Sequence, residues 1–202
     1  MRPRKRRSKN KLVAQVEAAR AERSVEVWAM DEHRVGLKPI LRRTWARRGE
    51  RPQVAVRPRY EWLYVYAFVC PETGESEFWL APSVNSAMFC EITAAFLRSR
   101  EQAVLLVLDQ AGWHMSAETL ALEADGVLAF EHLPPYSPEL MPAERLWELT
   151  DERLANRVFE RLADLEAVLG ETCVSLTDQP ARIQSRTLYH WWPGGADHTS
   201  TE

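Results

Sequence analysis

The sequence is poor in cysteine, and it has neither a long apolar run nor a leader-like N-terminus. Its three cysteines, Cys70, Cys90 and Cys173, are odd in number and far apart, which excludes a paired metal-binding motif and a disulfide framework. No run of eighteen apolar residues occurs, so we expect no membrane-spanning helix. The basic N-terminus lacks the apolar stretch and cleavage site of a signal peptide. These absences predict a protein of a reducing cytoplasm without membrane partners.

The sequence does contain enough apolar residues for one core, and its charge is unevenly distributed. Of the 202 residues, 46% are hydrophobic and 27% are charged, which suits one sizeable α/β domain. The net charge of −3 hides seven basic and no acidic residues within residues 1–11, and the remainder has 19 basic against 29 acidic residues. A second basic cluster lies between residues 38 and 59, opposed only by Glu50. Two positive segments on an acidic body predict a bound polyanion, with plain solvation as the alternative for the first segment.

Hydrophobic patterns predict five strands and four helices. The expected strands are residues 25–30, 62–69, 77–80, 104–108 and 127–130, and the expected helices are residues 85–98, 116–123, 142–156 and 162–176. Short connections make the first three strands antiparallel neighbours, whereas the continuous apolar run at 104–108 is typical of a central strand. Residues 41–56 could form an arginine-rich hairpin that turns at 48–50. This order predicts an α/β fold with a five-stranded mixed sheet, three antiparallel strands followed by parallel ones, flanked by helices.

Two aspartates and a glutamate occupy positions suited to metal chemistry. Asp31 ends the first expected strand, Asp109 ends the buried strand, and Glu144 lies in the first turn of the helix after a proline-rich loop. If the two strands are neighbours, both aspartates emerge at one edge of the sheet, and the loop could bring Glu144 there. Converging carboxylates need a compensating charge, which divalent cations such as Mg²⁺ supply. Alternatives stay open: a solvated strand end for Asp31, a helix-dipole role for Glu144, and Glu148 as the third carboxylate.

Residues 28–32 (WAMDE), 107–114 (VLDQAGWH) and 133–147 (LPPYSPELMPAERLW) resemble the three signature blocks of DDE transposases. More narrowly, they resemble the bacterial insertion-sequence branch of the mariner superfamily, and residues 43–49 (RTWARRG) resemble its strand pair after the first aspartate. Thirty-four residues separate Asp109 from Glu144, as in that family. The chain departs from the family pattern at three flanking positions, Gln110, Glu139 and Met141. The resemblance covers roughly residues 25–168.

This resemblance implies an RNase H-like fold and metal-dependent cutting and joining of double-stranded DNA. It makes Asp31, Asp109 and Glu144 the catalytic and metal-binding residues, with two Mg²⁺ ions, or Mn²⁺ as a substitute, as cofactors. Water would free a 3′-hydroxyl at the end of the mobile element, and this hydroxyl would attack target DNA, at a TA dinucleotide by family practice. A homodimer on DNA in the bacterial cytoplasm, at the nucleoid, is also implied. The arginines expected to contact the DNA backbone are Arg42, Arg43, Arg47, Arg48, Arg51, Arg57 and Arg59.

The expected organisation is a basic tail or linker at residues 1–24, a catalytic domain at 25–180 and a C-terminal tail at 181–202. Family members carry helix-turn-helix modules before this domain, so the chain could be a truncated copy, a fragment or the second half of a frameshifted protein. One alternative function is an inactive DNA-binding remnant that regulates full-length transposase, and another is a structure-selective nuclease acting in repair or on RNA–DNA hybrids. We expect a structural role for His114, and packing or loop anchoring for Trp45, Trp113 and Tyr136, with base stacking as the alternative.

Overall fold

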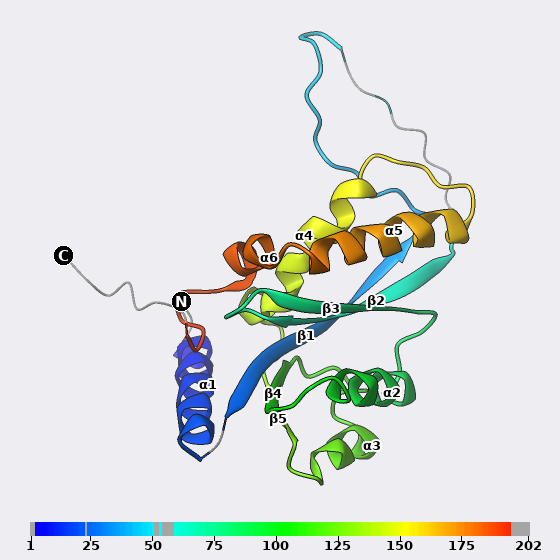
Figure 1. Ribbon diagram of the computed structural model, residues 1–202. Helices are drawn as coiled ribbons and strands as arrows, with labels where there is room; N and C mark the ends of the chain where they lie inside the picture. Colours follow the sequence, from blue (N-terminus) through cyan, green and yellow to red (C-terminus); the bar gives the residue numbers. More distant parts are fainter. Residues whose placement is uncertain (1–2, 23, 51–52, 54–58, 195–202) are drawn as a thin grey trace, which may run out of the picture.

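A five-stranded mixed sheet forms the centre of the protein (Figure 1). The computed structural model describes residues 3–22, 24–50, 53 and 59–194. The strands are β1 (Val25–Gly36), β2 (Trp62–Cys70), β3 (Glu75–Ala81), β4 (Ala103–Leu108) and β5 (Leu128–His132), in the order β3-β2-β1-β4-β5. β1 and β2 pair antiparallel, as do β2 and β3, whereas β4 pairs in parallel with both β1 and β5. The predicted α/β fold with three antiparallel strands followed by parallel ones is confirmed.

Helices cover both faces of the sheet, because successive side chains of a strand point to opposite faces and both sets are apolar here. Val27 and Ala29 of β1 join a core cluster that also takes side chains from α1 (Pro3–Glu22), α4 (Leu146–Thr150), α5 (Leu162–Thr177) and α6 (Pro180–Thr187). Trp28 and Met30 join a second cluster under α2 (Ser86–Leu97), next to α3 (Ala117–Leu120) (Figure 1). Four 3₁₀ turns complete the described elements: η1 (Ala121–Glu123), η2 (Pro138–Leu140), η3 (Pro142–Arg145) and η4 (Asp151–Arg153).

Three expected elements differ in the structure. The first strand does not end at Asp31, because pairing with β2 carries β1 on to Gly36, opposite Trp62. The helix expected at 142–156 is divided into η3, α4 and η4. Residues 38–50 form no strand, so the described part of the expected hairpin is absent, although the turn at its tip exists: the Glu50 amide donates to the Arg47 carbonyl oxygen (2.9 Å). Residues 51–52 and 54–56 of that segment lie outside the described residues.

Both ends of the described chain pack onto the core. Leu12 and Val16 of α1 are buried, as are Ile183 of α6 and Trp192. The domain boundaries expected at residues 24 and 180 therefore do not coincide with the limits of the packed core. Within the described residues, no helix has the length and apolar character needed to cross a bilayer.

Candidate active site

The register of the sheet brings Asp31 and Asp109 to one edge. The last parallel pair between β1 and β4 is Ala29 with Val107, and each aspartate comes two residues further along its chain. η3 packs against β1 and carries Glu144. Side chains of all three acidic residues line one cavity of about 340 Å³, together with the proline-rich loop at residues 133–138. Three segments distant in sequence thus place a carboxylate at a common cavity.

Asp31 is the most buried of the three carboxylates. The indole N–H of Trp147, from α4, donates to its Oδ2 at 3.1 Å. Burial, followed by the negative charges of Glu144 and Glu32, raises the pKa of Asp31 to about 8. The ionised form of Asp31 is therefore costly unless a positive charge comes close to it.

Asp109 has the opposite environment, although it lies at the same edge. Its Oδ1 accepts hydrogen bonds from His114 Nδ1 (2.7 Å) and from the Ala111 amide (2.9 Å), and its side chain is 53% exposed. Partial burial favours the protonated form, but the two hydrogen bonds and the charge of His114 outweigh it and hold the pKa of Asp109 below its ordinary value. Asp109 is therefore ionised at neutral pH and keeps an open side toward solvent.

Glu144 completes the set, and Glu148 does not. Partial burial raises the pKa of Glu144; the charge of His33 lowers it, and that of Asp109 raises it further. Glu148, the alternative third carboxylate, is absent from the cavity lining; its side chain is 60% exposed and its Oε2 lies 3.7 Å from Arg186 Nη1. The structure thus favours Glu144 over Glu148 as the third acidic residue.

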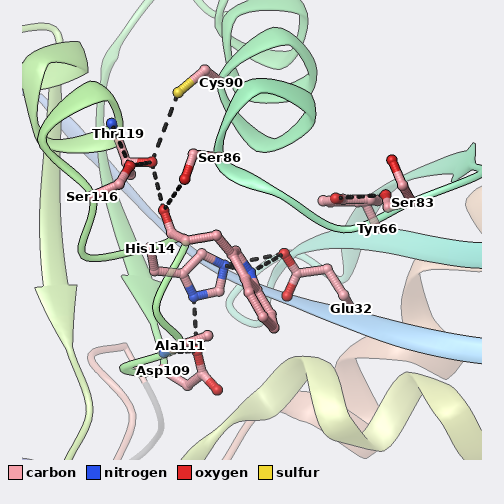
Figure 2. A network of polar contacts seen from close by, with 11 residues as sticks. Glu32, Tyr66, Ser83, Ser86, Cys90, Asp109, Ala111, His114, Ser116 and Thr119 are labelled. Atoms are coloured by element: carbon pink, nitrogen blue, oxygen red, sulfur yellow. Dashed lines mark hydrogen bonds and ion pairs between the residues drawn. The ribbon is translucent and has the colours of Figure 1, made fainter.

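A buried histidine connects the segments of the two aspartates (Figure 2). His114 is fully buried; its Nδ1 bonds to Asp109 and its Nε2 lies 3.1 Å from Glu32 Oε1, which also accepts from Trp113 Nε1 at 3.0 Å. Burial opposes protonation of the imidazole, but hydrogen bonds with Asp109 and Glu32 outweigh this and raise the pKa of His114 to about 9. Figure 2 shows the ring between the two carboxylates. A protonated His114 therefore links β1 to the segment after β4.

Sequence reasoning did not single out Glu32. Its position directly after Asp31 is the one available signal. Because neighbouring residues of a strand point to opposite faces, Asp31 and Glu32 cannot both face Trp147. Asp31 points to the α4 side of the sheet and Glu32 to the side of Trp113 and His114. The structural role expected for His114 agrees with its burial, and Trp113 anchors the loop through Glu32.

The three carboxylates are of the kind that binds hard divalent cations, although their side chains do not form a complete metal-binding site. Among the described residues, no three His, Cys, Asp or Glu side chains stand close enough to hold a metal ion as they are. However, three carboxylates line one cavity, and burial followed by nearby negative charge raises the pKa values of two of them, Asp31 and Glu144. Oxygen ligands of this kind suit Mg²⁺ or Mn²⁺, which use few carboxylates together with water or phosphate oxygens.

The expected DNA-binding arginines occupy the long connection between β1 and β2, residues 37–61, which we call the arginine loop (Figure 1). Arg42 donates to the Glu148 carbonyl oxygen (3.0 Å), and its backbone pairs with the Asn156 side chain. Arg59 donates to the Glu160 carbonyl oxygen (2.6 Å). These bonds tie one side of the loop to α4 and the other side to the segment before α5. Arg43, Arg47 and Arg48 are exposed, and Arg51 and Arg57 lie outside the described residues.

Solved structures share this architecture. The strand transfer complex of Mos1 matches 92% of this chain and 62% of its own, with a TM-score of 0.58 and 18% identity. The isolated catalytic domain of Mos1 mariner transposase matches over 92% of this chain and 91% of its own, with a TM-score of 0.58 and 16% identity. This chain thus spans less than two thirds of the length of the Mos1 chain in the strand transfer complex, and almost all of the isolated domain. These likenesses show the fold, and the predicted RNase H-like class is confirmed.

Sequence comparison identifies the family. An uncharacterized protein of Sinorhizobium fredii, y4pE/y4sA, is 33% identical over 136 residues, which cover 64% of this chain and 96% of that protein. Residues 26–166 match the DDE superfamily endonuclease family, and this match takes in Asp31, Asp109 and Glu144. Since that match spans well over half of the chain, the protein belongs to the DDE superfamily of endonucleases.

Proposed function

We propose that this chain acts as the catalytic domain of a DNA transposase, cutting DNA at the ends of a mobile element and joining those ends to target DNA. The observation that carries the proposal is the cavity at the sheet edge, which is lined by Asp31, Asp109 and Glu144 in a chain of the DDE endonuclease family. The likeness to Mos1 transposase in its strand transfer complex supports the choice of transposition among DDE reactions.

The three carboxylates would hold two Mg²⁺ ions, or Mn²⁺ in their place. Asp31, Asp109 and Glu144 would supply the carboxylate oxygens that hold these ions. When bound, such ions stabilise the attacking and leaving oxygens of an in-line displacement at phosphorus. Trp147 donates to the buried Asp31 and would orient this carboxylate, while Asp109, whose side chain is 53% exposed, would lie on the side open to the DNA.

His114 and Glu32 would act as positioning residues. His114 holds Asp109 through Nδ1 and Glu32 through Nε2, and Glu32 directly follows Asp31 in β1. One imidazole ring therefore fixes the separation of two metal-binding segments. Groups behind a metal ligand set its orientation and basicity in this way.

The arginine loop would contact the phosphate backbone of the DNA. Its exposed Arg43, Arg47 and Arg48 lie between tethered ends, so they offer a positive surface on a fixed base. Contacts of this kind position a duplex without reading its sequence. Both the site and the loop would work in a homodimer on double-stranded DNA, at the nucleoid of a bacterial cell.

The proposal is tested by cleavage of a pre-nicked or branched DNA duplex in Mg²⁺ and in Mn²⁺. Asp109→Ala should abolish nicking, because it removes a metal ligand, while circular dichroism and DNA binding stay close to wild type. The matched control is Asp125→Ala, which removes an exposed aspartate from the turn before β5. This control should cleave like the wild type.

Each alternative function predicts a different outcome. Wild-type-like nicking by Asp109→Ala would defeat the assignment of the carboxylates. Binding of the duplex without cleavage in either metal would favour a DNA-binding remnant that regulates full-length transposase. Cleavage of RNA–DNA hybrids with none of duplex DNA would favour a structure-selective nuclease.

A further inference from the structure

Tyr136 stands out at the rim of the active-site cavity. Its side chain is 97% exposed, yet it lines the same cavity as Asp31, Asp109 and Glu144. Other aromatic residues near this edge are held by contacts: Trp147 bonds to Asp31 and Trp113 to Glu32. The aromatic ring of Tyr136 is therefore accessible to a ligand that enters the cavity.

The backbone presents this ring at a conformational cost. Tyr136 has φ +56°, in the left-handed region that glycine and asparagine adopt more easily. Tyr136 lies between the exposed Pro135 and the buried Ser137, so the chain turns back toward the protein interior directly after the exposed ring. Strained backbone of this kind collects at functional sites, where the surrounding structure enforces it. A turn that served only to connect β5 with η2 would be formed better by glycine.

The loop is also stiff. Pro134, Pro135 and Pro138 fix their own φ angles, and the Gln110 side chain donates to the Leu133 carbonyl oxygen (2.9 Å). At the other end, the Leu140 amide donates to the Ser137 carbonyl oxygen (2.9 Å). A ring on such a support loses little conformational freedom when it binds a flat partner.

We propose that Tyr136 stacks on an unpaired nucleobase next to the scissile phosphate and thereby positions the strand for cleavage. This inference rests on the proposed function, which puts that phosphate at the three carboxylates. A nucleotide neighbouring the phosphate must pass the rim of the same cavity, where Tyr136 lies. Aromatic side chains bind bases through their faces with little regard to sequence, so the ligand class is an unstacked base and not one particular base.

A fluorescent base tests the contact directly. The probe is a nicked duplex with 2-aminopurine beside the nick, unpaired with the opposite strand, bound to the full chain in Ca²⁺. Stacking on Tyr136 quenches 2-aminopurine, so the wild-type complex should be dim and the Tyr136→Ala complex several-fold brighter. Tyr136→Phe keeps the ring and should remain dim. Equal brightness of wild type and Tyr136→Ala at equal saturation would overturn the inference.

Cleavage and stability together separate stacking from a structural role. Tyr136→Gly removes the ring and relieves the strained φ, so its melting temperature should equal or exceed that of the wild type. Its single-turnover cleavage in Mg²⁺ should fall about 10- to 100-fold, the range expected for loss of one base stack. Tyr136→Phe should keep most of the rate. A Tyr136→Gly variant that is destabilised, or that cleaves at the wild-type rate, would contradict the inference.

The outcomes also distinguish this inference from the function on which it rests. If the wild type cleaves and Tyr136→Ala cleaves equally well, only the stacking role fails. If the wild type quenches the probe and does not cleave in Mg²⁺ or Mn²⁺, the catalytic assignment fails while base stacking is supported. If the wild type neither binds nor cleaves the nicked duplex, both fail together.

Discussion

Asp31 and Asp109 each lie two residues beyond the last pair between β1 and β4, yet the protein treats their charges in opposite ways. Asp109 is half-exposed and receives a hydrogen bond from the buried, protonated His114, which keeps its pKa low. Asp31 is buried, receives its side-chain hydrogen bond from the neutral indole of Trp147 and lies in the field of Glu144, so its pKa rises to about 8. The two halves of one cavity therefore differ in how their negative charge is balanced.

This difference predicts which of the carboxylates would depend most on the proposed metal ions. On the Asp109 side the fold supplies its own positive charge through His114, and the carboxylate is oriented before any ion binds. On the side of Asp31 and Glu144, burial makes the ionised state unfavourable, and so do the charges of Glu144 and Glu32 on Asp31 and of Asp109 on Glu144. A divalent ion should thus stabilise the protein mainly through Asp31 and Glu144, whereas Asp109 contributes orientation.

The sharpest test is Asp31→Asn, which should abolish cleavage and yet stabilise the metal-free protein. The pKa of Asp31 rises from 3.8 to about 8 on folding, so the folded state keeps a proton that the unfolded chain releases. Stability is therefore lost as pH rises from about 4 to 8, and a neutral amide at this position removes that loss. Each unit of pKa shift corresponds to about 1.4 kcal/mol, and we expect a gain of at least this size at pH 8 and none near pH 4. Denaturant unfolding in EDTA measures it.

Added Mg²⁺ should reverse this advantage. In the wild type it compensates the charge of Asp31 and raises the melting temperature, whereas Asp31→Asn should respond weakly. Asp125→Asn, which neutralises an exposed aspartate, serves as the control and should match the wild type in both conditions. A destabilised Asp31→Asn in EDTA at pH 8 would contradict the proposed imbalance.

A second test removes the cation that the fold supplies, through His114→Gln. The pKa of His114 rises from 6.5 to about 9, so its stabilising contribution is complete below pH 6.5 and is lost as pH rises through 9. We expect the variant to lose roughly 3 kcal/mol at pH 6, because two carboxylates lose a shared buried partner, and little above pH 9. Cleavage should fall about 10- to 100-fold, with more Mg²⁺ needed for half-maximal rate.

His190→Gln is the matched control, because His190 is exposed and lies outside the cavity. Its unfolding free energy should follow the wild-type curve at every pH. If His114→Gln kept the wild-type Mg²⁺ requirement while losing stability, His114 would have a structural role only, and the positioning role would be wrong.

The same comparison explains what the sequence could and could not predict. Asp31, Asp109 and Glu144 each follow a local signal, an apolar strand before each aspartate and a proline-rich loop before the glutamate, and the resemblance to the DDE transposase blocks singled them out. The mixed sheet, with three antiparallel strands followed by parallel ones, was predicted from the strand pattern, whereas the RNase H-like fold was implied by the resemblance to DDE transposases. The strand pattern and the motif blocks are local features of the chain, which a sequence displays directly.

The electrostatic difference between the aspartates was not predictable, because it depends on contacts between distant segments. His114 bonds to Glu32, which is 82 positions away, and Trp147 bonds to Asp31, 116 positions away. The continuation of β1 to Gly36 was missed for a similar reason: its partner there is β2, while β4 has already ended. The local sequence of residues 31–36 does not indicate which strand will pair with them.

The smallest effect on stability should come from substitution of charged residues that lie outside the cavity. Arg47→Ala combined with Arg48→Ala removes two exposed cations from the arginine loop, so the dependence of unfolding on pH should remain that of the wild type. DNA affinity should fall modestly, and the slope of log affinity against log salt should become shallower by up to about 2, since each lost phosphate contact removes about 0.9.

Arg42→Ala is the informative comparison, because Arg42 donates to the Glu148 carbonyl oxygen and lies near Asp151. It should lower stability with little change in the salt slope. The opposite pattern, a shallower slope for Arg42→Ala than for the double variant, would place the DNA path at the base of the loop instead of its exposed turn.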